Sequence, residues 1–223
     1  HPLSTQARYW SKRILDTILA TVLLIVTLPL LVFIALAICL DSRGSFLFVQ
    51  ERVGCKRVRI KGQAYWQVRT FNVYKFRSMT ANADSARHRE HIAAYVAGDE
   101  EALGEGEITL KGVMQVTRVG RIIRKLSFDE LPQLVNVIKG QMSLVGPRPV
   151  PVYEIEAYEP QHYERLCALP GITGLWQVSG RCHTTFAEQI ALDIEYVRRQ
   201  TAWLDFKILL LTIPAVITGR GAA

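Results

Sequence analysis

The stretch ILDTILATVLLIVTLPLLVFIALAICL, residues 14–40, decides the organisation of the chain. It carries a single charge, Asp16, close to its start. About 20 consecutive apolar residues are enough for a helix to cross the hydrocarbon core of a bilayer, and this stretch has 27. We therefore predict that the segment enters lipid.

Two further features of this segment bear on its topology. Cationic residues flank both of its ends, and they are Arg8, Lys12 and Arg13 before it and Arg43, Arg52, Lys56, Arg57 and Arg59 after it. Cationic flanks tend to stay in the cytoplasm. Pro29 stands almost at the midpoint, where it removes an intrahelical hydrogen bond and bends the helix. Together they predict a re-entrant hairpin with both ends on the cytoplasmic side.

Two other interpretations of the segment stay open. A straight span can tolerate Pro29, because transmembrane helices carry proline more readily than soluble ones do. The tripeptide at 35–37, Ala-Leu-Ala, also imitates the cleavage site of a secretory signal. The segment is long for a signal, and the basic stretch beyond it resists export. The sequence therefore favours the hairpin.

Length and charge limit the classes of partner. At 223 residues, the chain has room for one domain with a sizeable core and a small membrane element. Lys and Arg exceed Asp and Glu by seven, which suits an anionic partner such as a phospholipid surface, a phosphorylated substrate or a nucleic acid. Residues 43–77 hold nine cationic residues and one acid, Glu51, and we expect this block to face the anion.

The remaining sequence predicts a sheet and several helices. Residues 46–53 and 68–77 mix aromatic, β-branched and basic residues, as strands do. Residues 185–200 show apolar side chains at helical spacing, and residues 203–217 are apolar enough to lie on or against lipid. Residues 81–112 are polar and acidic, and we expect them to form a mobile insertion.

These elements predict an α/β fold that is mostly helical with a small sheet. Residues 1–43 would form the N-terminal flank and the re-entrant membrane helix. Residues 44–223 would form a single cytoplasmic, membrane-associated domain. The four cysteines show no C-x-x-C spacing, so neither a zinc site nor a disulfide framework is indicated, and a reducing compartment fits best.

The chemistry concentrates in RIIRKLSFDELPQLVNVIKGQMSLVGPRP, residues 121–149. Ser127 and Glu130 have the spacing of a capping box, but Pro132 would then clash with the carbonyl of Phe128 one turn earlier. Pro132 suits the first position of a helix instead. We therefore predict that Asp129 and Glu130 lie just ahead of a helix, where its dipole stabilises ionised carboxylates. Such carboxylates suit a nucleophile or a metal ligand.

Basic residues around the two carboxylates outnumber them. Arg118, Arg121, Arg124 and Lys125 precede them, and the spare positive charge implies an anionic ligand. Prolines on both sides of Arg148 present it on a stiff loop. A surface turn with an incidental arginine would show the same sequence pattern. Carboxylates can hold a hard dication while guanidinium groups neutralise phosphate, which is what phosphoryl transfer requires.

Taken together, the motifs resemble the bacterial sugar transferase family, the monotopic polyprenyl-phosphate phosphoglycosyl transferases. The resemblance covers nearly the whole chain and is carried by residues 12–16, 50–54, 75–79, 129–133, 146–149 and 170–181. It implies an enzyme that transfers a sugar-1-phosphate from a UDP-sugar to polyprenyl (undecaprenyl) phosphate and releases UMP. Such an enzyme would act on the cytoplasmic face of the bacterial inner membrane, at the first membrane step of exopolysaccharide, O-antigen or capsule synthesis.

The resemblance also assigns roles to individual residues. Asp129 matches the nucleophile, which carries the sugar phosphate as an acyl-phosphate, and Glu130 matches the residue that holds Mg²⁺, with Asp129 beside it. The positions that match substrate-binding residues of the family are Arg124, Arg148 with its neighbours Pro147 and Pro149, Arg181, Lys75 and Arg77. The sequence around Trp176 is closer to that of family members that use UDP-glucose or UDP-galactose. This similarity points to a hexose rather than an N-acetylated sugar.

Two rival functions follow from the same charge pattern. A non-catalytic membrane adaptor would bind anionic lipid headgroups and use Asp129 and Glu130 only as caps, but it does not explain the clustered arginines and stiff loops. A nucleic-acid binder is disfavoured by the lipid segment and by the absence of a recognised binding motif in the sequence. A homo-oligomer is compatible with the sequence.

Overall fold

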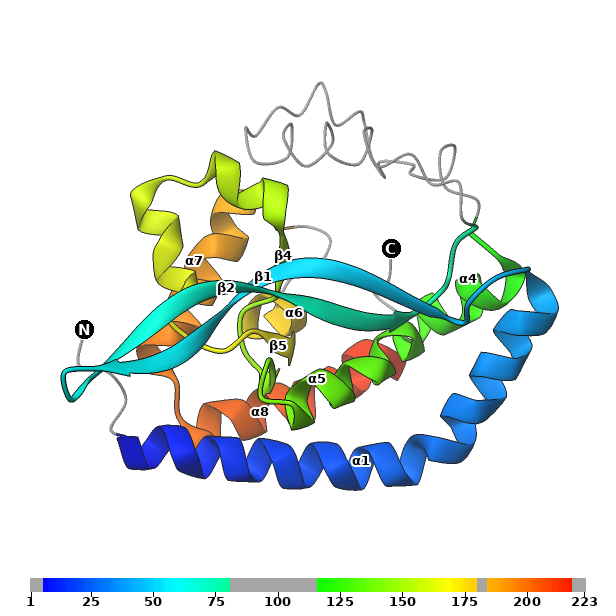
Figure 1. Ribbon diagram of the computed structural model, residues 1–223, viewed down its shortest axis with the longest axis horizontal. Coiled ribbons are helices and arrows are strands. Elements are labelled where there is room, and N and C mark those ends of the chain that lie inside the picture. Colours follow the sequence, from blue (N-terminus) through cyan, green and yellow to red (C-terminus); the bar gives the residue numbers. More distant parts are fainter. Residues whose placement is uncertain (1–5, 81–115, 180–183, 218–223) are drawn as a thin grey trace.

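The computed structural model describes residues 6–80, 116–179 and 184–217. Figure 1 shows a long N-terminal helix along one side of the molecule, a twisted β-hairpin that crosses above it, and shorter helices packed against both. The predicted mixture of helices with a small sheet is confirmed. The predicted insertion at 81–112 lies outside the described residues.

Helix α1, Gln6–Asp41, contains the apolar segment as one continuous helix with Pro29 inside it. The helix is bent along its length (Figure 1), as expected where a proline removes a backbone donor. Its part Tyr9–Asp41 is long and apolar enough to cross a membrane, and only 17% of its most apolar window is buried against the rest of the protein. Val26 and Phe33 are 70% and 69% exposed. Such exposed apolar surface suits lipid rather than water.

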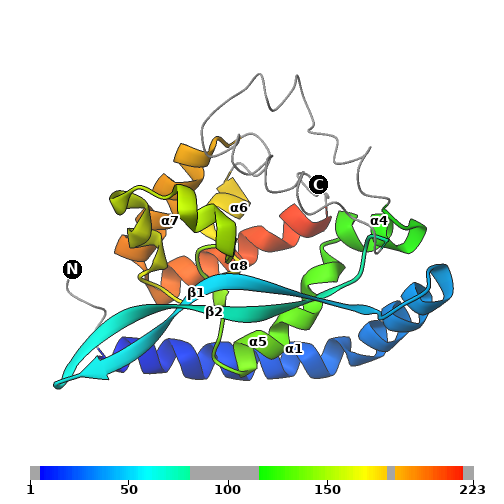
Figure 2. The ribbon, with the colours of Figure 1, turned by 45° about the horizontal axis from the view of Figure 1, so that its top comes forward.

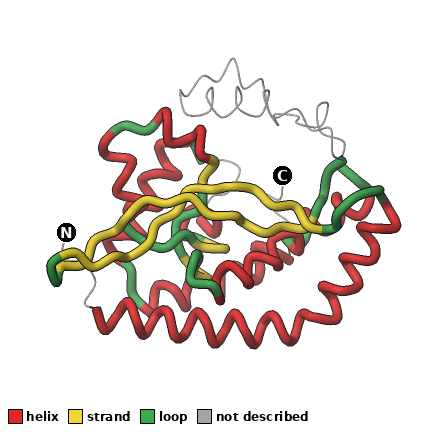
Figure 3. Tube along the Cα trace, viewed as in Figure 1, coloured by secondary structure: helices red, strands yellow, loops and turns green. Residues whose placement is uncertain are grey.

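Strands β1 (Leu47–Ile60) and β2 (Gln63–Phe76) form a long antiparallel hairpin. Lys61 and Gly62 make its two-residue turn, and both have positive φ angles, 50° and 82°, as the tight turns of hairpins require. Strand β4, Val150–Pro151, adds to the other side of β1, so the sheet order is β2-β1-β4. Figure 3 shows the two long strands crossing over the helices.

The hairpin is longer than the sequence predicted. The strands predicted at 46–53 and 68–77 are present, but pairing continues without a break through Gly54. Gly54 lies inside the strand and not at its end. Its lack of a side chain allows close packing, because a Cβ there would lie 2.7 Å from the Phe71 ring and 2.9 Å from Pro170. The glycine therefore marks a close approach between the sheet and residue 170.

The main core lies where α1 meets the rest of the domain. Helix α5 (Leu134–Ile138) sits between the hairpin and α1 (Figure 1) and contacts both. Strands β3 (Ser143–Val145) and β5 (Gly171–Thr173) pair in parallel beside it. The buried apolar cluster draws on most of these elements and comprises Ala20, Val73, Leu134, Val137, Met142, Leu144, Val145, Tyr196 and Ile208. The first half of α1 is thus part of the core.

The other helices frame this core. They are α4 (Arg118–Lys125), the 3-10 helices η2 (Phe128–Gln133), η3 (Val152–Ala157) and η4 (Pro160–Leu166), and helices α6 (Leu175–Ser179), α7 (Phe186–Arg199) and α8 (Ala202–Ile217). The helices predicted at 185–200 and 203–217 are confirmed as α7 and α8. Thr185 and Glu188 form the capping box that starts α7. Figure 2 shows α6, α7 and α8 grouped beside the hairpin.

Candidate active site

The two neighbouring carboxylates lie on a tight turn between α4 and α5. After α4 ends, Ser127 adopts a left-handed conformation (φ 55°), and η2 begins at the next residue. The prediction that Asp129 and Glu130 lie ahead of a helix that starts at Pro132 is wrong, because both lie inside η2. The Ser127 side chain makes no cap hydrogen bond, so the capping box is absent too.

The 3-10 geometry explains how Pro132 fits inside this turn. Its hydrogen bonds reach three residues back, as from the Glu130 amide to the Ser127 carbonyl (3.3 Å). An α-helix would need a bond from residue 132 to the carbonyl of Phe128, which proline cannot make. The short turn therefore brings two consecutive carboxylates to one place without an α-helical start.

Glu130 is held by two cations from different parts of the fold. Nζ of Lys75, near the end of β2, lies 2.9 Å from Oε1 of Glu130, and Nη2 of Arg148 lies 2.8 Å from the same oxygen. Burial by itself raises the pKa of Glu130, but the charges and hydrogen bonds of Arg148 and Lys75 outweigh it and lower the pKa to about 2. Glu130 is therefore ionised at neutral pH.

Asp129 has a different environment from its neighbour. Within the described part of the chain, its carboxylate makes no hydrogen bond or ion pair. Burial and the charge of Glu130 raise its pKa above the ordinary value, while the cations Lys75, Arg148 and Arg124 oppose that shift. Among the described residues, Asp129 is thus the carboxylate of the pair that keeps both oxygens free, with cations close enough to act on its charge.

The loop that carries Arg148 is fixed on both sides. The amide of Gly146 donates to the carbonyl of Thr173 (2.9 Å), and the amide of Gly171 donates to the carbonyl of Pro147 (2.8 Å). A Cβ on Gly146 would meet the Leu169 carbonyl at 2.2 Å, so only glycine fits there. Pro147 and Pro149 are both buried. The predicted stiffness of the loop has its basis in these contacts with β5.

The structure brings some of the predicted basic residues together and not others. Arg124 lies close enough to Asp129 for their charges to interact, although burial lowers the pKa of its guanidinium. Arg77 lies elsewhere: its Nη1 donates to the Arg43 carbonyl (2.8 Å) and its Nη2 to the Ser42 carbonyl (2.7 Å), just beyond α1. Arg181 lies outside the described residues.

A second contact joins the end of α1 to the site. Oδ2 of Asp41, the last residue of α1, accepts the amide of Val119 (3.1 Å) in the first turn of α4. Arg77 follows β2 directly, and α4 carries Arg124. The end of the apolar helix is therefore tied to two elements that supply basic residues to the carboxylates.

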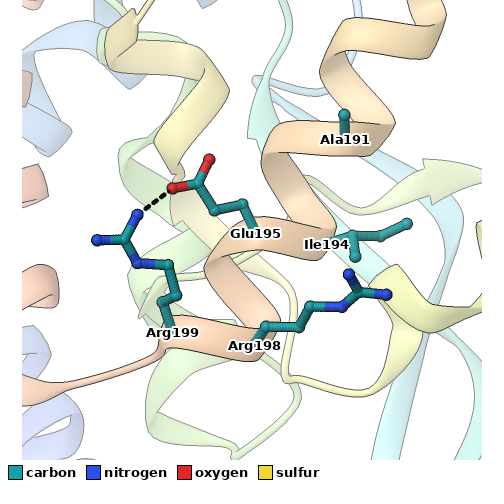
Figure 4. Close-up of a pocket in the computed structure, with 5 residues that line it drawn as sticks. All are labelled: Ala191, Ile194, Glu195, Arg198 and Arg199. Atoms are coloured by element: carbon teal, nitrogen blue, oxygen red, sulfur yellow. Dashed lines mark hydrogen bonds and ion pairs between the residues drawn. The ribbon is translucent and has the colours of Figure 1, made fainter.

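The described chain also has a hollow along α7, whose lining residues Ala191, Ile194, Glu195, Arg198 and Arg199 are drawn in Figure 4. None of these residues belongs to the motif stretch 121–149. Glu195 and Arg199 form an ion pair one turn apart, and Arg198 is 56% exposed. The hollow therefore lies outside the set of residues predicted to carry the chemistry.

A family model described as bacterial sugar transferase matches residues 7–219. The chain belongs to the bacterial sugar transferase family. The family predicted from the motifs is thereby confirmed. Within the family, the chain is 37% identical over 214 residues to the exopolysaccharide production protein ExoY of Sinorhizobium fredii, covering 95% of this chain and 88% of that protein.

Two other members carry names that state a reaction. The undecaprenyl-phosphate galactose phosphotransferase of Salmonella typhimurium is 37% identical over 99% of this chain and 43% of its own length. The UDP-glucose:undecaprenyl-phosphate glucose-1-phosphate transferase of Caulobacter vibrioides is 38% identical over 99% of this chain and 75% of its own length. The chain thus spans less than half of some relatives and most of others. These names agree with the prediction that the chain is an enzyme of this class.

Asp129 and Glu130 supply oxygen ligands of the kind that divalent metals prefer. The described residues contain no group of three or more metal-ligating side chains. Mg²⁺, however, is usually bound by one or two carboxylates together with substrate phosphates and water. Asp129 has both oxygens free of bonds to described residues, and Glu130 uses only Oε1. This donor set fits a metal that is shared with a phosphorylated substrate.

Sequence reasoning missed two buried groups that support the site. Arg165 is 4% exposed, and its Nη2 donates both to Asp193 (2.5 Å) and to the Arg148 carbonyl (3.4 Å). Asp193 is a charged residue on the apolar face of α7. A charge at such a position is visible in the sequence and indicates a buried ionic partner. Asn136 is also completely buried. Nothing in the sequence around Asn136 indicates its hydrogen-bond partners on β2, Asn72 and Tyr74.

Proposed function

We propose that the chain transfers a sugar-1-phosphate, namely a hexose-1-phosphate, from a UDP-sugar to polyprenyl phosphate and releases UMP. The observation that carries the proposal is the pair of unequal carboxylates: Glu130 is bound by Lys75 and Arg148, whereas Asp129 beside it has no bond to a described residue. The names of the Salmonella and Caulobacter relatives support the same chemistry.

In the first half-reaction, a carboxylate oxygen of Asp129 attacks the β-phosphorus of the UDP-sugar. The bond between that phosphorus and the bridging oxygen breaks, and UMP leaves with the electron pair. The sugar phosphate stays on Asp129 as an acyl-phosphate. The raised pKa of Asp129 makes its ionised carboxylate a stronger nucleophile than an ordinary aspartate.

In the second half-reaction, an oxygen of polyprenyl phosphate attacks the phosphorus of the acyl-phosphate. The bond to Asp129 breaks, which regenerates the carboxylate and leaves the sugar on a polyprenyl diphosphate. This order of events is ping-pong chemistry.

The surrounding residues stabilise charge during both steps. Arg148 and Arg124 would neutralise phosphate oxygens, and the motif around Arg181 suggests the same task for it. Glu130, with Asp129 beside it, would hold Mg²⁺. The ion, when bound, would neutralise the diphosphate and so make UMP a better leaving group. Lys75 keeps Glu130 ionised, which a hard cation requires of its ligand.

The exposed apolar surface of α1 supports a membrane site for this reaction. Pro29 and the basic flanks of α1 favour a re-entrant helix with both ends on the cytoplasmic side of the bacterial inner membrane. Both substrates are accessible there, because UDP-sugars are made in the cytoplasm and polyprenyl phosphate lies in the bilayer. We place the reaction at the first membrane step of exopolysaccharide, O-antigen or capsule synthesis.

The proposal is tested by incubating the protein in vesicles with Mg²⁺, undecaprenyl phosphate and a panel of UDP-sugars, and by measuring UMP. UMP formed with UDP-glucose or UDP-galactose supports the proposal, whereas UMP formed only with UDP-N-acetyl sugars corrects the donor. Binding to anionic vesicles without any UMP release would favour a non-catalytic membrane adaptor.

A further inference from the structure

Strand β2 has an edge that no described strand covers, because the sheet order is β2-β1-β4. Unpaired backbone groups on such an edge need other partners. At the point where β2 approaches the active site, the side chain of Asn136 supplies them. Its Oδ1 accepts the amide of Tyr74 (3.1 Å), and its Nδ2 donates to the carbonyl of Asn72 (2.7 Å).

This pair of bonds imitates a neighbouring strand. In a parallel pair of strands, a residue donates its amide to the carbonyl of the residue before its partner. Its own carbonyl accepts the amide of the residue after that partner. The carboxamide of Asn136 does the same around Val73, which is 1% exposed. One side chain therefore replaces a peptide group at the edge of β2.

Asn136 is itself held rigidly. It is 0% exposed, and its Nδ2 also donates to Oε1 of Gln141 (2.8 Å). Its own carbonyl accepts the amides of Gln141 (3.0 Å) and Met142 (3.3 Å). With every polar atom of the carboxamide bonded, the side chain has one defined position, and removing it would leave buried groups on β2 unsatisfied.

The bridge joins the two parts of the chain that carry an active-site ion pair. Tyr74 directly precedes Lys75, whose Nζ lies 2.9 Å from Glu130. Asn136 belongs to α5, which follows directly from η2, the turn that holds Glu130. The bridge thus fixes β2, at the residue before Lys75, against α5, the helix that directly follows the turn carrying Glu130.

We infer that Asn136 is a positioning residue that sets the Lys75–Glu130 contact by completing the edge of β2. The effect of Asn136 on catalysis rests on the proposed function. The effect of Asn136 on the position of Lys75 rests on geometry alone. It predicts that loss of the carboxamide acts on the chemistry through Lys75 and not through general loosening of the fold.

The first test is a double-mutant cycle on UMP release in a single turnover, with UDP-glucose and Mg²⁺. Asn136→Ala should lower the rate by about tenfold or more while UDP-glucose binding changes by no more than about threefold. In a Lys75→Met background, Asn136→Ala should lower the rate by less than about threefold further. Additive losses would overturn the inference.

The second readout does not depend on turnover. The paired Lys75 amine should react slowly with acetic anhydride, and mass spectrometry should find its acetylation faster by about tenfold in Asn136→Ala, since a lost positioning bond frees the amine. Asn136→Asp, which keeps the shape and Oδ1 but loses both donations from Nδ2, covers the case in which the alanine variant fails to fold.

The matched control is Ile190→Ala, which removes a buried side chain (4% exposed) from α7. It should lower stability by a similar amount without changing the reactivity of Lys75 or the rate per folded molecule. Unchanged Lys75 reactivity in both Asn136 variants would overturn the inference. If the wild-type protein releases no UMP but Lys75 still responds, the proposed function fails and the positioning role stands.

Discussion

Nη2 of Arg148 lies 2.8 Å from Oε1 of Glu130, and this contact separates two adjacent carboxylates into different chemical states. Glu130 has a pKa lowered to about 2, because Arg148 and Lys75 outweigh the effect of burial. Asp129 has a raised pKa and no bond to a described residue. Neighbouring acids whose pKa values are pushed apart are a sign of divided roles in catalysis.

Asp129→Asn should abolish the covalent step, because the amide keeps the shape of the side chain but lacks an anionic oxygen. Wild-type protein with UDP-sugar and Mg²⁺, but without polyprenyl phosphate, should release at most about one UMP per site and keep the sugar phosphate on Asp129. Mass spectrometry should find a hydroxylamine-sensitive adduct there, absent from the variant. UMP that appears only after the lipid acceptor is added would instead favour direct attack by the lipid phosphate.

Glu130→Gln should weaken the dependence on Mg²⁺, because a neutral amide is a poorer ligand for a hard cation. We expect the Mg²⁺ concentration at half-maximal rate to rise by about tenfold or more, which corresponds to about 1.4 kcal/mol. Titration of the burst rate with Mg²⁺ measures the shift. Glu188→Gln, on the exposed capping box of α7, is the control and should leave the titration unchanged.

Lys75→Met should move the acid limb of the burst rate to higher pH. Asp129 must be ionised to attack, and burial and Glu130 already raise its pKa while Lys75 lowers it. Without Lys75, the pKa rises further, so the rate falls at a higher pH than in the wild type. The pH at half-maximal burst rate measures the change, and the exposed Lys56→Met is the control. A shift toward lower pH would contradict this account of Asp129.

Arg148→Lys keeps the positive charge but loses the planar fork that binds phosphate through two donors. We expect transfer to fall by about tenfold, or about 1.4 kcal/mol of transition-state stabilisation, with little change in melting temperature. Arg198→Lys, at the exposed pair with Glu164, should leave transfer unchanged. A large drop in melting temperature with normal activity per folded molecule would mean that Arg148 serves the fold.

The re-entrant topology predicts that both ends of the apolar helix are shielded in intact cells. Single cysteines introduced as Ser4→Cys and Ser45→Cys, in a background that lacks the four native cysteines, should both resist an impermeant thiol reagent and react after the cells are opened. Labelling of position 4 alone in intact cells would support a straight span. Pro29→Ala should shift the protein toward that pattern, because the helix regains its missing donor.

Much of this fold could be predicted from the sequence because local signals were strong. The apolar run, the aromatic and β-branched strands and the helical spacing of apolar residues at 185–200 each specify their own element. The backbone conformation at Asp129 was harder to predict from the sequence. Whether a turn forms a 3-10 or an α-helix depends on how Pro132 and the residues around it pack, and spacing alone does not show that.

The site residues also divide into those that the sequence could place and those that it could not. The family resemblance predicted that Lys75 and Arg77 both bind substrate near the carboxylates. Strand β2 ends at Phe76, and Arg77 leaves the sheet to bind the Ser42 and Arg43 carbonyls. The bridge from Asn136 to β2 spans more than sixty residues of chain, so only the folded structure brings its partners together.

The junction at the end of α1 has a consequence for how substrates meet. Asp41 bonds to the start of α4, and Arg77 joins the end of β2 to residues just beyond α1. If α1 lies in the bilayer as we propose, this junction holds the reactive carboxylates at a constant height above the membrane surface. A lipid phosphate that diffuses in two dimensions then arrives at the depth of the attacking group, and its search covers an area instead of a volume.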